Sequence, residues 1–142
     1  MTTATFTATP TAPSIDLSRK AVWTGGVLST LAVLFLLFDA TGKLMQPEQV
    51  VKGTTELGWP VSALVPLGVI QLLCLAFYLI PRTSLFGAIL WTGYLGGAIA
   101  THLRLDQPLF SHTLFPTYIA ALLWVGLWLR DRRLRALLPI SR

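Results

Sequence analysis

Residues 61–80 read VSALVPLGVIQLLCLAFYLI, twenty consecutive residues without a charged side chain. As an α-helix this stretch would be about 30 Å long, which matches the hydrocarbon core of a bilayer. Three further apolar stretches of similar length occupy residues 21–38, 84–102 and 113–129, and short polar joints separate them. The sequence therefore predicts an all-α integral membrane protein, a bundle of four membrane-spanning helices.

The composition agrees with a chain embedded in lipid. Hydrophobic residues make up 54% of the 142 residues and charged residues 12%, against about 25% charged in ordinary soluble domains. The single cysteine, Cys74, excludes an internal disulfide and a CxxC redox centre. A small apolar filler inside the second span is the role we expect for it.

The basic residues indicate how the chain crosses the membrane. The net charge is +5, and eight of the eleven basic residues fall on one predicted side: Arg19, Lys20, Arg82, Arg130, Arg132, Arg133, Arg135 and Arg142. Because lysine and arginine accumulate on the cytoplasmic side, we expect a multi-pass protein of the cell inner membrane with both termini cytoplasmic. An arginine cluster beside a span favours anionic lipid headgroups as its partner over nucleic acid.

Three regions follow from this pattern. Residues 1–18 are rich in Thr, Ala and Pro and are predicted to form a disordered cytoplasmic tail. Residues 19–138 form the predicted transmembrane domain, and residues 139–142 a C-terminal tail. A cleaved signal peptide within residues 1–40 is the rival interpretation, but the apolar run is longer than a typical signal sequence.

Between the first two spans, residues 47–57 have the pattern of a short amphipathic helix. Apolar positions fall on one face, and Glu48, Lys52 and Glu56 are spaced by four on another, where neighbouring charges can attract. Gly58 is a plausible helix C-cap. We expect this helix to lie on the membrane surface between spans one and two.

The third span carries glycines at helical spacing. Gly93 and Gly97 form a GxxxG step, with Thr101 one turn further on the same face. Small residues at this spacing let helix backbones approach closely. A packing seam inside the bundle is the first interpretation, and a homodimer through Gly93 and Gly97 is the alternative.

Topology brings several polar residues to one end of the bundle. Spans one and three run in the same direction, so Asp39 and Lys43 should finish near His102. A carboxylate beside a histidine can exchange protons near neutral pH, which makes these three residues candidate catalytic groups. The competing interpretation is that they mark the membrane interface, where charged groups at helix ends reach water.

Other polar residues near this end are candidate ligand-binding groups: Gln71, Tyr94, Thr101, Arg104 and Tyr118. An amide within a span needs a partner, which is more often another helix than a ligand. The tyrosines could donate to a bound carbonyl or simply pack. Metal binding has little support, since His102 and His112 lack a third group at ligand spacing.

Longer strings carry a family resemblance. They are GAILWTGYLGGAIATHLR at residues 87–104, FDATGKL at 38–44 with the following Pro47-Glu48, ELGWP at 56–60, LIPRTSLFGA at 79–88, and WLRDRRLRALLP near the C-terminus. Their order and spacing over about residues 20–140 resemble the DoxX-like family of small bacterial membrane proteins. That resemblance implies a four-helix membrane bundle, and the positions of Asp39, Lys43 and His102 fit it. Many relatives have an acidic residue near the position of Gln71, which is a departure here.

Three functions compete at this stage. The first is an accessory or ligand-binding protein for a lipophilic molecule. Similarity to the wider DoxX/DoxD group, which includes thiosulfate:quinone oxidoreductase, implies by analogy a quinone-linked redox role. The sequence itself requires no cofactor. The second is an intramembrane acid–base enzyme, an isomerase or epoxide-opening enzyme, with Asp39 as base, His102 as acid or relay and Lys43 as charge stabiliser. The third is a transporter or channel subunit, which the lack of polar residues from face to face disfavours.

Overall fold

The computed structural model describes residues 18–137, and it is helical throughout that range apart from short joints. Its elements are α1 (Arg19–Met45), α2 (Glu48–Glu56), the short turn η1 (Val61–Ala63), α3 (Leu64–Leu79), α4 (Ser84–Arg104), the π-helical turn η2 (Leu109–Thr113), α5 (Phe115–Arg130) and α6 (Arg132–Leu137). The predicted tails, residues 1–18 and 139–142, lie outside this range except for Ser18. The Ser18 hydroxyl accepts a hydrogen bond from the Ala21 amide and caps α1.

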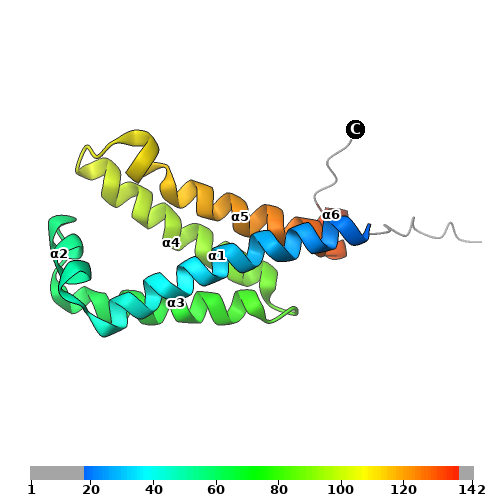
Figure 1. Ribbon diagram of the computed structural model, residues 1–142, viewed down its shortest axis with the longest axis horizontal. Coiled ribbons are helices and arrows are strands. Elements are labelled where there is room, and N and C mark those ends of the chain that lie inside the picture. The colour runs from blue at the N-terminus through cyan, green and yellow to red at the C-terminus, as the bar shows by residue number, and fades with distance from the viewer. Residues whose placement is uncertain (1–17, 138–142) are drawn as a thin grey trace, which may run out of the picture.

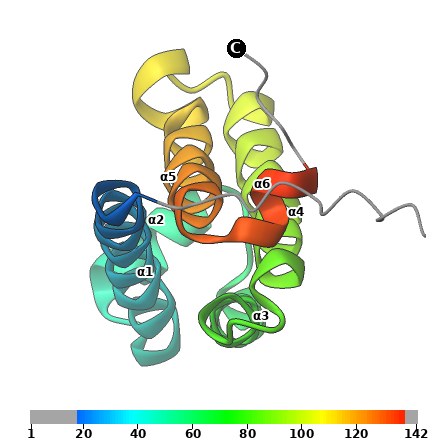
Figure 2. The same cartoon turned by 90° about the vertical axis from the view of Figure 1, so that its right-hand side faces the viewer.

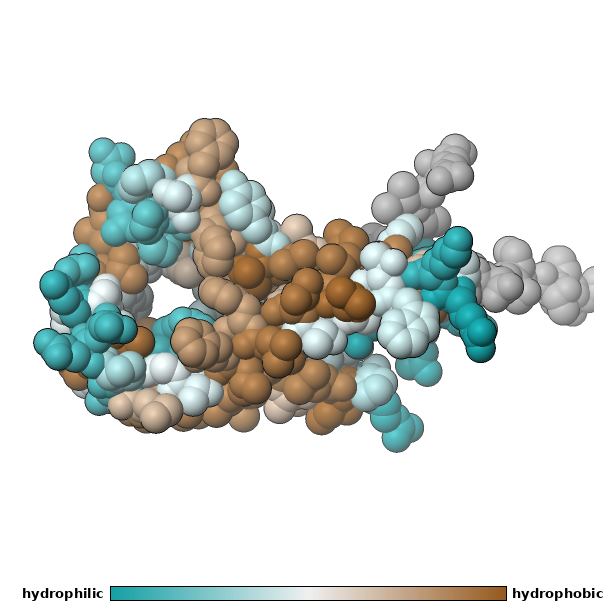
Figure 3. Space-filling model, in the orientation of Figure 1, coloured by the Kyte–Doolittle hydropathy of each residue, from teal (hydrophilic) through white to brown (hydrophobic). Residues whose placement is uncertain are grey.

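Four helical segments within the described residues are long and apolar enough to span a membrane: Arg19–Met45, Val61–Leu79, Ser84–Arg104 and Leu109–Arg130. The all-α four-helix prediction is thereby confirmed. Each segment also exposes large apolar side chains that a soluble protein would bury, including Leu34, Leu73, Ile89 and Val125. On the face drawn in Figure 3, a broad apolar band lies between two polar ends of the molecule.

The four long helices form a ring in which α1 packs against α3 and α5, and α4 closes the ring between them (Figures 1 and 2). The start of α1 and the short helix α6 lie at one end, which we call the basic end. The other end carries α2 and η2 and is called the α2 end (Figure 1). At the basic end, Asp131 caps α6 by accepting from the Arg133 amide, and Leu134 is buried in the core.

Close helix contacts hold the basic end together. A Cβ atom on Gly25 would lie 2.7 Å from the Gly126 carbonyl oxygen, so α1 and α5 approach because these positions lack side chains. The buried Tyr78 hydroxyl donates to the Leu123 carbonyl at 2.9 Å and pairs with the Ser29 hydroxyl at 2.9 Å. Three helices are therefore joined by one hydroxyl, where lipid offers no competing water.

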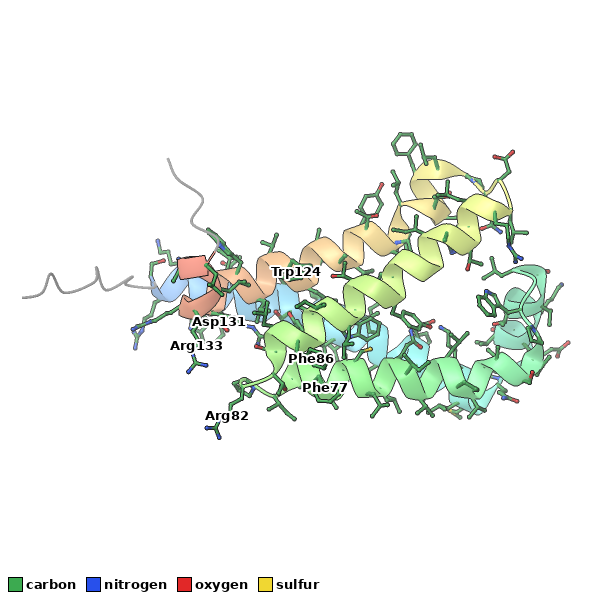
Figure 4. The ribbon with its side chains drawn as sticks, turned by 180° about the vertical axis from the view of Figure 1, so that it is seen from behind. Phe77, Arg82, Phe86, Trp124, Asp131 and Arg133 are labelled. Atoms are coloured by element: carbon green, nitrogen blue, oxygen red, sulfur yellow. The ribbon has the colours of Figure 1, made fainter. Side chains whose placement is uncertain are left out.

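The α3–α4 hairpin is also tightly packed at this end. A Cβ on Gly87 would lie 2.3 Å from the Tyr78 backbone nitrogen. Phe77 and Phe86 form an edge-to-face pair with ring centroids 5.3 Å apart across the hairpin, and Arg82 at the turn points away from the bundle (Figure 4). Helices α3 and α4 are therefore antiparallel neighbours joined by a short turn.

At the α2 end the pair α1 and α3 separates from the pair α4 and α5 (Figure 1). The chain reverses into α2 through Gln46, whose φ is 51°, and leaves it through Gly58, whose φ is +77°. Helix α2 agrees with the predicted segment to within a residue at each end and contains no buried residue. Within the described residues no ion pair joins Glu48, Lys52 and Glu56, whose side chains are exposed to solvent, where such pairs gain little.

Candidate functional site

A cavity of about 420 Å³ lies where the helices separate, and a gap passes through the molecule near the α2 end (Figure 3). This volume falls within the range of small-molecule sites. Apolar side chains from all four long helices form most of its wall: Phe35, Leu36, Leu67, Leu95, Phe115, Pro116 and Ile119. The predicted residues that also line it are Asp39, Lys43, Gln71, Tyr94, Thr101 and His102.

The polar centre of the cavity is built on α1 and α3. Helix α1 continues beyond its apolar stretch to Met45, so Asp39 and Lys43 stand one turn apart on one face and form an ion pair. The Gln71 carboxamide on α3 donates from Nε2 to the same Asp39 oxygen, Oδ2, at 2.6 Å. Gln71 is 1% exposed, and its Oε1 has no hydrogen-bond partner among the described residues.

The α4 wall contributes Tyr94, Thr101 and His102. The Thr101 hydroxyl donates to the Gly97 carbonyl of its own helix at 3.0 Å. His102 Nδ1 pairs with Gln107 Oε1 at 2.8 Å, and the His102 and His112 rings lie 6.2 Å apart edge to face. No hydrogen bond joins His102 to Asp39 within residues 18–137, although both line the same cavity.

Gly93 and Gly97 also lie on the α4 wall, and this corrects one expectation. The sequence predicted a packing seam inside the bundle, yet a Cβ at either position would find no atom within 4 Å. The helices diverge here, so these glycines face the cavity instead of another backbone. The close contacts are made by Gly25, Gly87 and Gly126, which the GxxxG pattern did not single out.

Two predicted ligand-binding residues lie away from the cavity lining. Arg104 Nη2 donates to the Leu57 carbonyl at the end of α2, 2.9 Å away, and thereby ties α4 to the α2–α3 joint. Tyr118 is exposed, and its hydroxyl makes a long bond of 3.4 Å to the Phe110 carbonyl. Neither residue appears among those that line the cavity.

The segment that carries α2 covers part of the cavity through Thr54, Leu57 and Trp59. Sequence reasoning placed α2 on the membrane surface, but did not connect this helix or Trp59 with the site. The amphipathic pattern of α2 was the signal that could have shown this, because its apolar face has to pack against another part of the protein or against lipid. Within residues 18–137 no group of three His, Cys, Asp or Glu side chains is placed to hold a metal ion.

The comparisons with known proteins give one match. A family model described as the DoxX-like family matches residues 27–126, which is more than half of the chain and includes every residue of the cavity's polar centre. No curated protein and no solved structure matches the chain.

Proposed function

The chain belongs to the DoxX-like family, and from this premise we propose that it is a small integral membrane protein that binds a lipophilic molecule in the cavity at its α2 end. The observation that carries the proposal is the convergence of polar groups from α1, α3 and α4 on a cavity with mainly apolar walls. Sites for small molecules combine those two properties.

The fold supports the proposal because it leaves the cavity unfilled. The basic end is closed by glycine contacts and a buried tyrosine, whereas the α2 end leaves about 420 Å³ open beside an ion pair. Charged side chains within a bilayer are costly, and those that face a cavity are therefore candidates for a functional site. A quinone is one candidate ligand, on the analogy with the wider DoxX/DoxD group.

Gly97 and Gly96 allow a matched test. Both stand on α4 with open space where a Cβ would be, but Gly97 lines the cavity and Gly96 does not. The protein would be purified from its membranes in mild detergent, and bound small molecules extracted and identified by mass spectrometry. We expect a lipophilic molecule with the wild type and Gly96→Leu, and its loss with Gly97→Leu. Equal recovery from all three proteins would refute binding in this cavity.

A second candidate function, acid–base catalysis, is favoured by the Asp39 carboxylate. Its Oδ2 is held by Lys43 and Gln71, while Oδ1 takes no hydrogen bond from residues 18–137 and could accept a proton. His102 on the α4 wall would supply or relay a proton. The test is conversion of a lipophilic epoxide to its diol by the purified protein; Asp39→Asn would abolish turnover, and absence of conversion by the wild type would leave binding as the function.

We further propose an inner-membrane location with the basic end in the cytoplasm. Basic residues at the start of α1, in the α3–α4 turn and in and around α6 support it: Arg19, Lys20, Arg82, Arg130, Arg132, Arg133 and Arg135. At each terminus we expect activity from a reporter that works only in the cytoplasm, and none from a reporter that works only outside it.

A homodimer through Gly93 and Gly97 stays a separate prediction. If the protein is such a dimer, light scattering should show that Gly93→Leu converts it into a monomer. A wild-type protein that is already monomeric would exclude the dimer.

A further inference from the structure

Two hydrogen-bond acceptors on residues that line the cavity have no donor within the described residues. Asp39 Oδ2 accepts from both Lys43 and Gln71, which leaves Asp39 Oδ1 and Gln71 Oε1 without a donor within the described residues. The orientation of the Gln71 amide follows from chemistry, because an ionised carboxylate can only accept, so Nε2 must face Asp39. Asp39 and Gln71 both line the same cavity.

The environment of the Gln71 side-chain oxygen is energetically unfavourable. It is fully buried, and an amide oxygen without a donor in a low-dielectric environment is destabilising. The terminal torsion of a glutamine is soft, so a small rotation can present Oε1 to a group in the cavity. The Asp39 side chain, 38% exposed, is accessible without such a rotation.

The charges along the wall exclude a charged head group. Asp39 and Lys43 neutralise each other, and His102 is bonded through Nδ1 to Gln107. A ligand cation or anion would therefore enter a low-dielectric site without a counter-ion of its own. An uncharged donor meets the open acceptors without this cost.

The α4 wall indicates which uncharged donor fits. The Thr101 hydroxyl already donates to Gly97, while the Tyr94 hydroxyl makes no hydrogen bond within residues 18–137. A ligand hydroxyl can donate to Asp39 or Gln71 and accept from Tyr94, which an N–H group cannot do. The missing side chains of Gly93 and Gly97 leave space for an apolar body beside it.

We infer that the ligand is an uncharged lipophilic alcohol or phenol, whose hydroxyl donates to the acceptors presented by Asp39 and Gln71; this inference rests on the proposed ligand-binding function. The hydroxyl replaces the missing donor at the polar centre. The apolar body lies along the α4 glycines.

Three probes of one shape test the head group. Binding of para-octylphenol, para-octylanisole and para-octylbenzylamine would be measured by calorimetry with the full chain in nanodiscs, after subtraction of partition into empty nanodiscs. We expect the phenol to bind about tenfold more tightly than the anisole, the effect of one hydrogen bond. We expect the protonated amine to bind no better than the anisole.

Three variants locate the effect. Gln71→Leu should reduce the preference for phenol over anisole, and Tyr118→Phe, which alters a hydroxyl away from the cavity lining, should leave it unchanged. Gly97→Leu should weaken both neutral probes. If Gln71→Leu fails to fold, the phenol-to-anisole ratio of the wild type still decides the matter.

The outcomes separate the two proposals. Equal affinity of phenol and anisole, with both lost in Gly97→Leu, would overturn the hydroxyl inference and leave ligand binding in place. Tighter binding of the amine would overturn the uncharged head group. No binding of any probe, together with no co-purified molecule, would overturn the proposed function itself.

Discussion

The two halves of this bundle use the same residue types for opposite purposes. At the basic end, Gly25, Gly87 and Gly126 bring backbones together, and a Cβ at any of them would meet another residue's atoms at under 3 Å. At the α2 end, Gly93 and Gly97 on the same helix as Gly87 face open volume. Glycine thus closes one half and hollows the other, and what differs is the distance to the next helix.

Polar side chains follow the same division. The buried Tyr78 hydroxyl satisfies one acceptor and one hydroxyl on two other helices. The buried Gln71 amide satisfies one acceptor and leaves its own oxygen open. A fully satisfied polar network rigidifies a bundle, whereas a buried polar atom without a partner is destabilising and needs an explanation.

The largest effect on stability should come from adding a side chain at the glycine contact between α3 and α4. Gly87→Ala would place a Cβ 2.3 Å from the Tyr78 backbone nitrogen, and we expect it to lower the free energy of unfolding by about 3 kcal/mol. Gly93→Ala, six residues further along the same helix, should leave the free energy of unfolding unchanged or raise it by up to about 1 kcal/mol, since alanine favours the helix. Thermal unfolding in detergent compares them; similar losses in both variants would contradict the division into two halves.

The next largest effect concerns the ion pair. Lys43→Met, Asp39→Asn and the double variant form a cycle, for which we expect a coupling of about 1–2 kcal/mol, below that of fully buried pairs because Asp39 is partly exposed. The exposed Glu48 and Lys52 on α2 provide the control cycle, with a coupling below about 0.5 kcal/mol. Unfolding in a denaturing detergent gives both values. A coupling near zero for Asp39 and Lys43 would mean that the pair only marks the interface.

A smaller effect should follow from loss of the Tyr78 hydroxyl. Tyr78→Phe leaves the Ser29 hydroxyl and the Leu123 carbonyl without this partner and should cost about 1 kcal/mol, the size found for interhelical hydrogen bonds in membranes. Tyr118→Phe, with its single long bond, should stay within about 0.5 kcal/mol of the wild type. The prediction fails if the two variants unfold at the same temperature.

The smallest effect on stability should be at α2. Arg104→Ala removes the hydrogen bond to the Leu57 carbonyl and should change global stability by less than about 0.5 kcal/mol. Amide hydrogen exchange across residues 48–56 should nevertheless become several-fold faster, because α2 has no buried residue to hold it. Arg82→Ala, at the opposite end and pointing outward, is the control. Unchanged exchange in Arg104→Ala would show that α2 is held by other contacts.

Some site residues were predictable because topology is fixed by the bilayer. Four crossings place the ends of α1 and α4 at one end, so Asp39, Lys43 and His102 could be grouped from the sequence, and all three line the cavity. Arg104 and Tyr118 belong to the same end, but their side chains bond to Leu57 and Phe110 instead. The direction of a side chain around its helix depends on helix rotation, which sequence spacing leaves open.

The sequence by itself determined that this chain has four helices long and apolar enough to cross a membrane, because an apolar stretch of about twenty residues satisfies its own backbone in lipid as a helix. It also determined the amphipathic helix between the first two spans. Tertiary structure alone decided which glycines pack and which line a cavity, since a missing Cβ permits either. It likewise decided that Gln71 faces Asp39, because the crossing of α1 and α3 sets that contact across 32 residues of sequence.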